Sequence, residues 1–124
     1  MVTSAARSAG RSDCLPWFEK GRTVIIEYIR YDLKQHAPAE LIAAYGRASA
    51  HLAAAPECLA YELTHCEEAE NALILRIEWT STEAHLNGFR KGPHFAPFLA
   101  EIRPFVAEIA EMRHYRTTSV SWRR

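Results

Sequence analysis

The sequence predicts an α+β fold of the ferredoxin-like type, the split βαβ arrangement β-α-β-β-α-β, with a four-stranded antiparallel sheet and both helical regions on one face. Three observations predict it. Strand-like and helix-like stretches follow one another in that order. Two of the strand-like stretches are separated only by the polar segment EEAEN, which is short enough to close a hairpin. The 124 residues, 48% of them hydrophobic, suffice for one domain with a core and are too few for two ordinary ones.

The first half of the chain contains the clearest signals. Residues 23–32 (TVIIEYIRYD) are β-branched and aromatic, with apolar groups on both alternating faces, as in a strand covered on two sides. Residues 38–54 form a helix because Pro38 suits its first turn, apolar residues recur at helical spacing, and Pro56 stops it. Residues 59–66 and 72–79 alternate with period two and form the hairpin.

The second half is predicted to hold a broken helix and a last strand. Thr80 followed by Glu83 fits a capping box, so a helix is expected from Trp79 to the Gly92-Pro93 break. A second helical piece is expected to begin near Pro97 and to end before Pro104, because proline inside a helix removes a hydrogen bond. Residues 109–118 resume strand-like alternation. The predicted organisation is therefore a flexible arm (1–22), a domain (23–118) and a tail (119–124).

The sheet face away from the helices predicts a homodimer. If Tyr28 and Trp79 face the helices, the opposite face mixes apolar side chains with opposite charges that can pair across strands. Such a face is too apolar to favour water and too charged for a monomer core, so a second copy is expected to cover it, giving a dimeric α/β barrel. The residues expected on it are Ile25, Glu27, Ile29, Tyr31, Ile74, Arg76 and Glu78.

Charge and hydropathy exclude several classes of partner. Fifteen Lys and Arg balance fifteen Asp and Glu, so no net field attracts nucleic acid or an anionic membrane. The N-terminal segment has no apolar run of the kind found in signal peptides or membrane spans, and a cytoplasmic location is expected. The histidines show no HxxxH or similar metal-binding spacing, so no metal site is expected.

Four stretches together resemble the antibiotic biosynthesis monooxygenase family over about residues 23–118. They are AAAPECLAYEL, RIEWTSTEAH, GPHFAPF and EMRHY. The resemblance implies two sheets facing each other across a dimer, with a small cavity between sheet and helices in each subunit. Some members oxidise quinol-like or anthrone-like aromatics with molecular oxygen and no metal or flavin, whereas others degrade haem or have no assigned reaction.

Departures from the family pattern separate these branches. The asparagine, tryptophan and histidine that define the haem-degrading site align with Tyr28, Phe89 and Leu99. Leu99 cannot ligate iron, which argues against haem degradation by that route. Many other members have a histidine where this chain has Phe89, and His85, one helical turn earlier, is a candidate substitute.

The resemblance therefore implies a cofactor-independent monooxygenase-like enzyme for a small planar aromatic, quinol or polyketide-like substrate. A base must remove a proton from the substrate, donors must hold oxygen atoms, and an apolar wall must exclude water. His85 and His94 are the candidate bases, and Arg90, Tyr28 and the Trp79 indole are the candidate oxygen-holding groups. The predicted wall consists of Leu75, Phe89, Phe95 and Phe98.

Each candidate also has a structural alternative. His85 can be a solvated helix residue, His94 can satisfy backbone groups at the helix break, and Trp79 can be core. Arg90 can pair with acids in solvent, and His114 is expected to make a structural hydrogen bond in preference to a catalytic one. The alternative function is a non-catalytic dimeric module that binds a small ligand, with haem as one possibility through His85, His94 or His114.

Overall fold

The computed structural model describes residues 24–124. It divides into a folded unit, Ile25–Tyr115, and a second unit of which Val24 and Arg116–Arg124 are described. Within the second unit, Val24 N donates to Thr117 Oγ1 (3.1 Å) and Thr117 N donates to Val24 O (3.0 Å). The predicted flexible arm, residues 1–22, lies outside the described residues.

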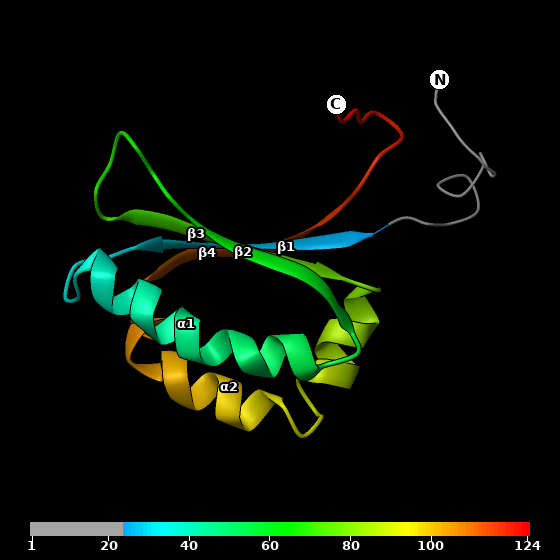
Figure 1. The fold of residues 1–124 in the computed structure, drawn as a ribbon, viewed down its shortest axis with the longest axis horizontal. Coiled ribbons are helices and arrows are strands. Elements are labelled where there is room, and N and C mark those ends of the chain that lie inside the picture. Colours follow the sequence, from blue (N-terminus) through cyan, green and yellow to red (C-terminus); the bar gives the residue numbers. More distant parts are fainter. Residues whose placement is uncertain (1–23) are drawn as a thin grey trace. The chain divides into compact units, whose positions relative to one another are not determined.

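The folded unit is one four-stranded antiparallel sheet in the order β2-β3-β1-β4, with the helices beneath one face (Figure 1). The strands are β1 (Ile25–Asp32), β2 (Cys58–His65), β3 (Ala72–Trp79) and β4 (Ile109–Arg116). β3 pairs antiparallel with both β1 and β2, with a register shift in β2 between Cys58 and Ala60. The ferredoxin-like prediction is confirmed, while the dimeric barrel stays a prediction.

Helix α1 (Pro38–Ala54) has the predicted limits. Pro38 occupies the first turn, and Glu40 Oε1 accepts a hydrogen bond from Ala37 N (2.8 Å), which fixes the start of the helix. The hairpin is also confirmed, with Cys66 N donating to Ala72 O (2.9 Å) across its end. Both features are local, and both were encoded by residues within a few positions of the boundary.

The region after β3 begins with a π-helix, η1 (Ala84–Phe89). The predicted capping residue is wrong by one position, because Ser81 Oγ, and not Thr80, accepts the hydrogen bond from Ala84 N (2.9 Å). Ser81 O then accepts from His85 N (3.2 Å). Thr80 was predicted from its spacing to Glu83, but serine is the stronger N-cap residue and Ser81 takes that place.

Helix α2 (Phe95–Ile102) begins two residues before the predicted start at Pro97. Pro97 is tolerated there because amide groups of a first helical turn have no intrahelical partner. A 3₁₀-helix, η2 (Arg103–Glu108), follows with Pro104 near its start and leads directly into β4. β4 ends at Arg116, two residues before the predicted limit.

The register between β1 and β3 corrects the predicted sheet faces. Trp79 is fully buried in the core and pairs with Ile25, and Glu27 pairs with Ile77, so the odd-numbered residues of β1 face the helices. Tyr28 pairs with Arg76 and lies on the opposite face, where it packs edge-on against Tyr115 (5.4 Å between ring centroids). The prediction that Tyr28 faces the helices is therefore wrong. So is the placement on the open face of Ile25, Glu27, Ile29 and Tyr31.

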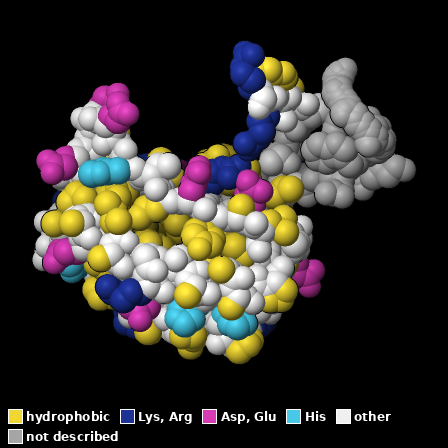
Figure 2. All heavy atoms as spheres, viewed as in Figure 1, with side chains coloured by type: hydrophobic (Ala, Val, Ile, Leu, Met, Phe, Trp, Pro, Cys, Tyr) yellow, Lys and Arg dark blue, Asp and Glu magenta, His cyan; other side chains and the backbone are white. Residues whose placement is uncertain are grey.

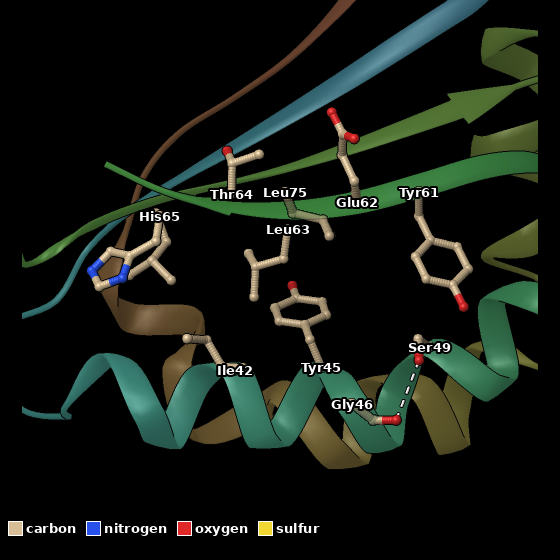
Figure 3. Close-up of a pocket in the computed structure, with 11 residues that line it drawn as sticks. Ile42, Tyr45, Gly46, Ser49, Tyr61, Glu62, Leu63, Thr64, His65 and Leu75 are labelled. Carbon is tan, nitrogen blue, oxygen red and sulfur yellow. Dashed lines mark hydrogen bonds between the residues drawn. The ribbon is translucent and has the colours of Figure 1, made fainter. Parts of the chain in front are cut away.

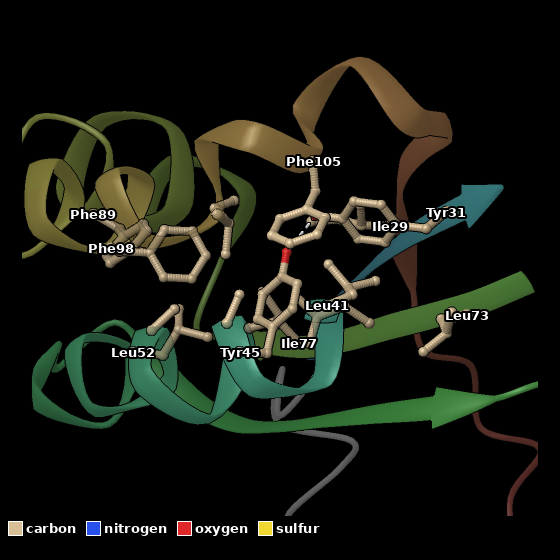
Figure 4. Close-up of a cluster of buried hydrophobic side chains, with 14 of the residues drawn as sticks. Ile29, Tyr31, Leu41, Tyr45, Leu52, Leu73, Ile77, Phe89, Phe98 and Phe105 are labelled. Atoms are coloured by element: carbon tan, nitrogen blue, oxygen red, sulfur yellow. Dashed lines mark hydrogen bonds between the residues drawn. The ribbon is translucent and has the colours of Figure 1, made fainter. Parts of the chain in front are cut away.

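The core lies between the sheet and the helices (Figure 4). It joins the inward side chains of β1 and β3 to those of α1 and α2, with Phe105 of η2 closing one side. Burying a large apolar side chain stabilises a fold by about 1.5–3 kcal/mol. The largest buried members are Tyr31, Leu41, Tyr45, Leu52, Leu73, Leu75, Ile77, Trp79, Phe89, Phe98, Ile102 and Phe105.

The open face of the sheet keeps the predicted mixed character and three of its predicted members, Ile74, Arg76 and Glu78, whereas its β1 members are the even-numbered residues. Arg30 Nε lies 3.6 Å from Glu111 Oε1 and joins β1 to β4, and Arg76 pairs with Glu78 (2.7 Å). Tyr28, Ile74 and Tyr115 lie among these charges and line a hollow of about 270 Å³. None of the helices in residues 24–124 combines the length and apolarity that crossing a bilayer requires.

Candidate functional site

Three polar side chains, Glu27, His85 and His114, form a buried row between the sheet and η1, here called the histidine chain. His85 lies at its centre, with Nδ1 2.8 Å from His114 Nε2 and Nε2 3.5 Å from Glu27 Oε1. The Trp79 indole N–H donates to the same Glu27 oxygen (3.0 Å). Glu27 is 1% exposed and His85 4% exposed, while His114 is half-buried. The chain therefore leads from a fully buried carboxylate to an imidazole that water reaches.

Each member is held by a different element. Glu27 and Trp79 come from adjacent strands, and the Trp79 ring stacks on the His85 ring (centroids 4.4 Å apart, planes 12° apart). Ser81 fixes the start of the helical segment that carries His85, and Arg90 N donates to His85 O (3.0 Å) across the π-turn. π-Helical turns are rare and occur often at functional sites. His114 reaches the group from β4.

Electrostatics keep both imidazoles neutral. Burial, the positive charge of Arg90 and the neighbouring His114 together lower the pKa of His85 to about 3, with burial the largest cause. Burial and Arg90 also lower the pKa of His114. Burial raises the pKa of Glu27, although the Trp79 hydrogen bond and the Arg90 charge oppose that effect. At neutral pH the two histidines are therefore proton acceptors.

The donor atoms of Glu27, His85 and His114 lie within 4.8 Å of one another, close enough to consider a metal ion in the described residues. Two features argue against a metal ion here. The Trp79 N–H, which cannot bind a cation, is directed at the Glu27 oxygen. The Arg90 guanidinium acts on both histidines and would repel a cation placed between them.

The predicted apolar wall packs around the Trp79 end of this chain. Phe89 lies 5.1 Å from Trp79 between ring centroids, and it contacts Phe95 and Phe98 edge-on at 5.6 and 5.5 Å. Phe89 and Phe98 are buried and belong to the core (Figure 4). The three rings thus support the site and also fill the interior.

The remaining predicted site residues lie outside this group of contacts. Arg90 is exposed and acts on the histidines only through its charge. His94 is half-buried at the start of α2, where its carbonyl oxygen accepts from Phe98 N (3.2 Å). Tyr28 lies on the open face of the sheet, away from Trp79 and His85. Leu75 faces the helices in β3, one inward position beyond Ile77.

A cavity of about 300 Å³ lies elsewhere, between α1 and β2 (Figure 3). Leu75 is the one predicted site residue that lines it; His85, His94 and Trp79 do not. Its lining residues are Ile42, Tyr45, Gly46, Ser49, Tyr61, Glu62, Leu63, Thr64, His65, Leu73 and Leu75. The cavity is therefore not a pocket next to the histidine chain.

Glu27 is the site residue that sequence reasoning missed. It was assigned to the open face as one of several charges, because β1 carries apolar groups on both faces and its alternation does not identify the inner one. A signal was present, since a lone carboxylate among inward apolar residues needs a buried partner. His114 was expected to make a structural hydrogen bond, and its bond to His85 is the contact found.

The comparisons with known proteins agree with the fold. The sequence profile of the antibiotic biosynthesis monooxygenase family matches residues 24–101. No curated protein sequence matches the chain. Among solved structures, a Bordetella bronchiseptica protein provisionally assigned as an antibiotic biosynthesis monooxygenase aligns with TM-score 0.63 and 20% identity, covering 79% of this chain and 98% of that one.

Two further solved structures show the same fold. SnoaB from Streptomyces nogalater, a cofactor-independent oxygenase, aligns with TM-score 0.59 and 20% identity over 82% of this chain and 96% of its own. Rv0793 from Mycobacterium tuberculosis aligns with TM-score 0.56 and 18% identity over 81% of this chain and 97% of its own. At these identities the likeness shows the shared fold.

Proposed function

The chain belongs to the antibiotic biosynthesis monooxygenase family, and we propose on this premise that it is a cofactor-independent monooxygenase acting on a small planar aromatic, quinol or polyketide-like substrate. The observation that carries the proposal is the buried Glu27–His85–His114 chain. It has the parts that proton removal requires: a neutral base, a second imidazole that orients the base by a hydrogen bond, and a carboxylate that stabilises the resulting charge.

The proton path follows the contacts. The outer nitrogen of His114, Nδ1, takes the proton from the substrate, and the Nε2–H of the resulting imidazolium donates to neutral His85 Nδ1 over 2.8 Å. The Nε2–H of His85 in turn faces Glu27. This is the logic of a carboxylate-oriented histidine in hydrolytic triads, extended by one imidazole. His114 therefore contacts the substrate, and His85, one of the two candidate bases from the sequence, orients His114 and stays neutral.

The remaining candidates receive adjusted roles. The Trp79 N–H is used by Glu27, so the indole orients the carboxylate and stacks on His85; it does not hold substrate oxygen. The Arg90 charge lowers the pKa of both histidines and is suited to stabilise an anionic substrate next to them. His94 remains an alternative base, and a His94 variant is tested together with the His85 and His114 variants.

Apolar surface next to His114 suits an aromatic substrate. Met112 shares the inward face of β4 with His114 and is 44% exposed, and Leu86 follows His85 and is 39% exposed. Large apolar side chains left in contact with water are sites where an apolar ligand gains free energy by binding. Met112, two residues from His114 in the same strand, lies beside the exposed end of the proton path.

The reaction needs no external electron donor. Deprotonation makes the substrate electron-rich enough to react with molecular oxygen. In the anthrone case, a methylene carbon loses two hydrogens and becomes a carbonyl, one oxygen atom enters the product, and the other leaves as water. The carbon gives up the four electrons that reduce both oxygen atoms, so the step balances without a metal or flavin.

Homodimer formation belongs to the same proposal. The open face of the sheet combines Tyr28, Ile74 and Tyr115 with the Arg30–Glu111 pair, and a second copy would cover these groups with like ones. Sedimentation equilibrium should give the dimer mass for the wild type and a shift toward monomer for Tyr28→Asp. A wild-type protein that sediments as a monomer would exclude the proposed homodimer. The cytoplasmic location also stays a prediction.

Oxygen consumption with anthrone and with hydroquinones tests the proposal. Rates above the protein-free background should fall about 10²–10⁴-fold for His114→Gln and His85→Gln, the usual contribution of general-base catalysis. His51→Gln, a change on α1 remote from the chain in sequence and absent from its contacts, should leave the rate unchanged. Undiminished rates in both chain variants would refute the base assignment, and a loss confined to His94→Ala would transfer it to His94.

The second candidate function is a non-catalytic module that binds a small ligand, favoured by the cavity that excludes the histidine chain. Haem is the ligand most easily tested. A Soret shift on mixing with haemin that disappears in His85→Ala, His94→Ala or His114→Ala would identify an axial ligand. A shift retained in all three variants, or its absence, would remove these histidines as haem ligands.

A further inference from the structure

We propose that the cavity between α1 and β2 is a ligand site separate from the histidine chain, and that it takes a flat, uncharged aromatic molecule with a carbonyl oxygen. The cavity measures about 300 Å³, at the lower end of the range for small-molecule sites. Hydrophobic side chains gather over this part of the molecule in the space-filling view (Figure 2).

The walls are apolar and partly in contact with water. Ile42 of α1 is 47% exposed and Tyr61 of β2 is 40% exposed, and they lie toward opposite ends of the cavity (Figure 3). In Figure 3 the Tyr45 and Tyr61 rings both stand between the helix and the strand, with Leu63 beside them. Aromatic rings favour flat aromatic ligands through stacked or edge-on contacts. Filling the space would remove these side chains from water.

A buried hydroxyl supplies the reason for a carbonyl group. The Tyr31 and Tyr45 hydroxyls lie 2.5 Å apart, and Tyr31 is 0% and Tyr45 4% exposed. Each phenol has one proton, so one hydroxyl donates to the other and the second proton is left without a partner among the described residues. A buried donor without an acceptor costs about 1–3 kcal/mol. When Tyr31 is the donor of the pair, the free proton is that of Tyr45. Because Tyr45 lines the cavity, a ligand oxygen can accept that proton and so stabilise this arrangement.

Charge favours an uncharged ligand. Glu62 is the one acidic lining residue, and it pairs with Arg76 in the sheet register, which directs it to the open face. Figure 3 shows Glu62 and Thr64 pointing away from α1. Burial raises the pKa of Tyr31 to about 12 and that of Tyr45 further, so both phenols remain donors at neutral pH.

The cavity and the histidine chain contact different residues of β3. Leu73 and Leu75 line the cavity, Trp79 belongs to the chain, and Ile77 between them is 1% exposed and packed in the core. Inward residues of a strand are about 6.6 Å apart, so Leu75 and Trp79 are separated by roughly 13 Å. A change that fills the cavity should therefore leave the proposed proton path intact.

Gly46 offers a precise way to fill it. Gly46 lines the cavity, and an added Cβ atom there meets nothing within 4 Å. Gly46→Leu therefore places a side chain in open space and also replaces glycine by a strong helix former, so it should fold at least as stably as the wild type. Ala43→Leu is the matched control, since Ala43 is exposed on the same helix and does not line the cavity.

The test is a titration with 9-fluorenone, a flat aromatic ketone, followed by amide chemical shifts. Saturable shifts should centre on residues 42–49 and 61–65 in the wild type and in Ala43→Leu, and disappear in Gly46→Leu. Fluorene, which lacks the carbonyl, should bind about three- to tenfold more weakly, as expected for one lost neutral hydrogen bond. Tyr45→Phe should reduce fluorenone affinity to that of fluorene.

Binding that persists in Gly46→Leu, or a wild type that does not bind, would overturn the site. Equal affinities for fluorenone and fluorene in the wild type would overturn the carbonyl requirement and show that water satisfies the hydroxyl. Because Gly46→Leu leaves the histidines unchanged, its oxygen-consumption rate separates this proposal from the proposed function. Lost ligand binding with retained oxygen consumption is the expected pair of results.

Discussion

Protonation of His85 should destabilise the protein on mild acidification. Its pKa is lowered from 6.5 to about 3, so the unfolded chain binds a proton at His85 well before the native state does. The stability this group contributes is complete above pH 6.5 and is lost as pH falls toward 3. Between pH 6.5 and 4.5 the full shift corresponds to about 2 kcal/mol. Because half-buried His114 admits water beside the ring, screening reduces this to about 1 kcal/mol.

Urea denaturation at a series of pH values measures this effect. The wild type should lose stability across the window, and His85→Gln, which cannot titrate, should lose about 1 kcal/mol less. Glu27 acts in the opposite sense because its pKa is raised, so the comparison of the two proteins, and not the wild-type slope alone, isolates His85. Parallel stability curves would show that His85 is not held neutral by its surroundings, which would refute the electrostatic reasoning.

Four other substitutions have defined outcomes. Glu108→Gln should weaken the loop before α1, because the Glu108 carboxylate accepts hydrogen bonds from Lys34 N and Gln35 N at 2.6 and 2.8 Å. These bonds lower the pKa of Glu108 to about 2. In acid-denaturation curves the wild type should therefore lose this stabilisation between pH 4.5 and 2, whereas the variant has none to lose. Trp79→Phe leaves Glu27 without its indole donor and should cost about 1–3 kcal/mol in urea denaturation; an unchanged midpoint would exclude that hydrogen bond as a support. Gly92→Ala places a Cβ atom 2.7 Å from a backbone carbonyl oxygen and should lower the thermal midpoint, whereas Gly46→Ala, in open space, should raise it.

Much of the fold was predictable because its signals are local. Pro38 and Pro56 bracket α1, and the EEAEN segment closes the hairpin at the expected residues. The helix boundaries that differ from the prediction are those where two neighbouring residues can both cap the helix, or where a proline is tolerated in the first helical turn. Ser81 replaced Thr80 as the capping residue, and α2 accommodated Pro97 in its first turn. Neither difference changed the order of the elements.

The site was only partly predictable because it depends on strand register. The pairing of Ile25 with Trp79 places Glu27 inward and Tyr28 outward, and a shift of one residue would reverse both. β1 has apolar residues on both faces, so its pattern contains no information about that choice. The cavity between α1 and β2 depends on how side chains fill the space between two elements, which no spacing rule predicts.

The central claim is that the Glu27–His85–His114 chain removes a proton so that molecular oxygen can react with an aromatic substrate. Incubation with anthrone under isotopically labelled oxygen, followed by mass analysis of the product, tests it most directly. The expected result is one labelled oxygen atom per product molecule, formed at a rate that depends on the protein and falls sharply in His114→Gln. Product formed at the protein-free rate, or oxidised at an equal rate by His114→Gln, would contradict it.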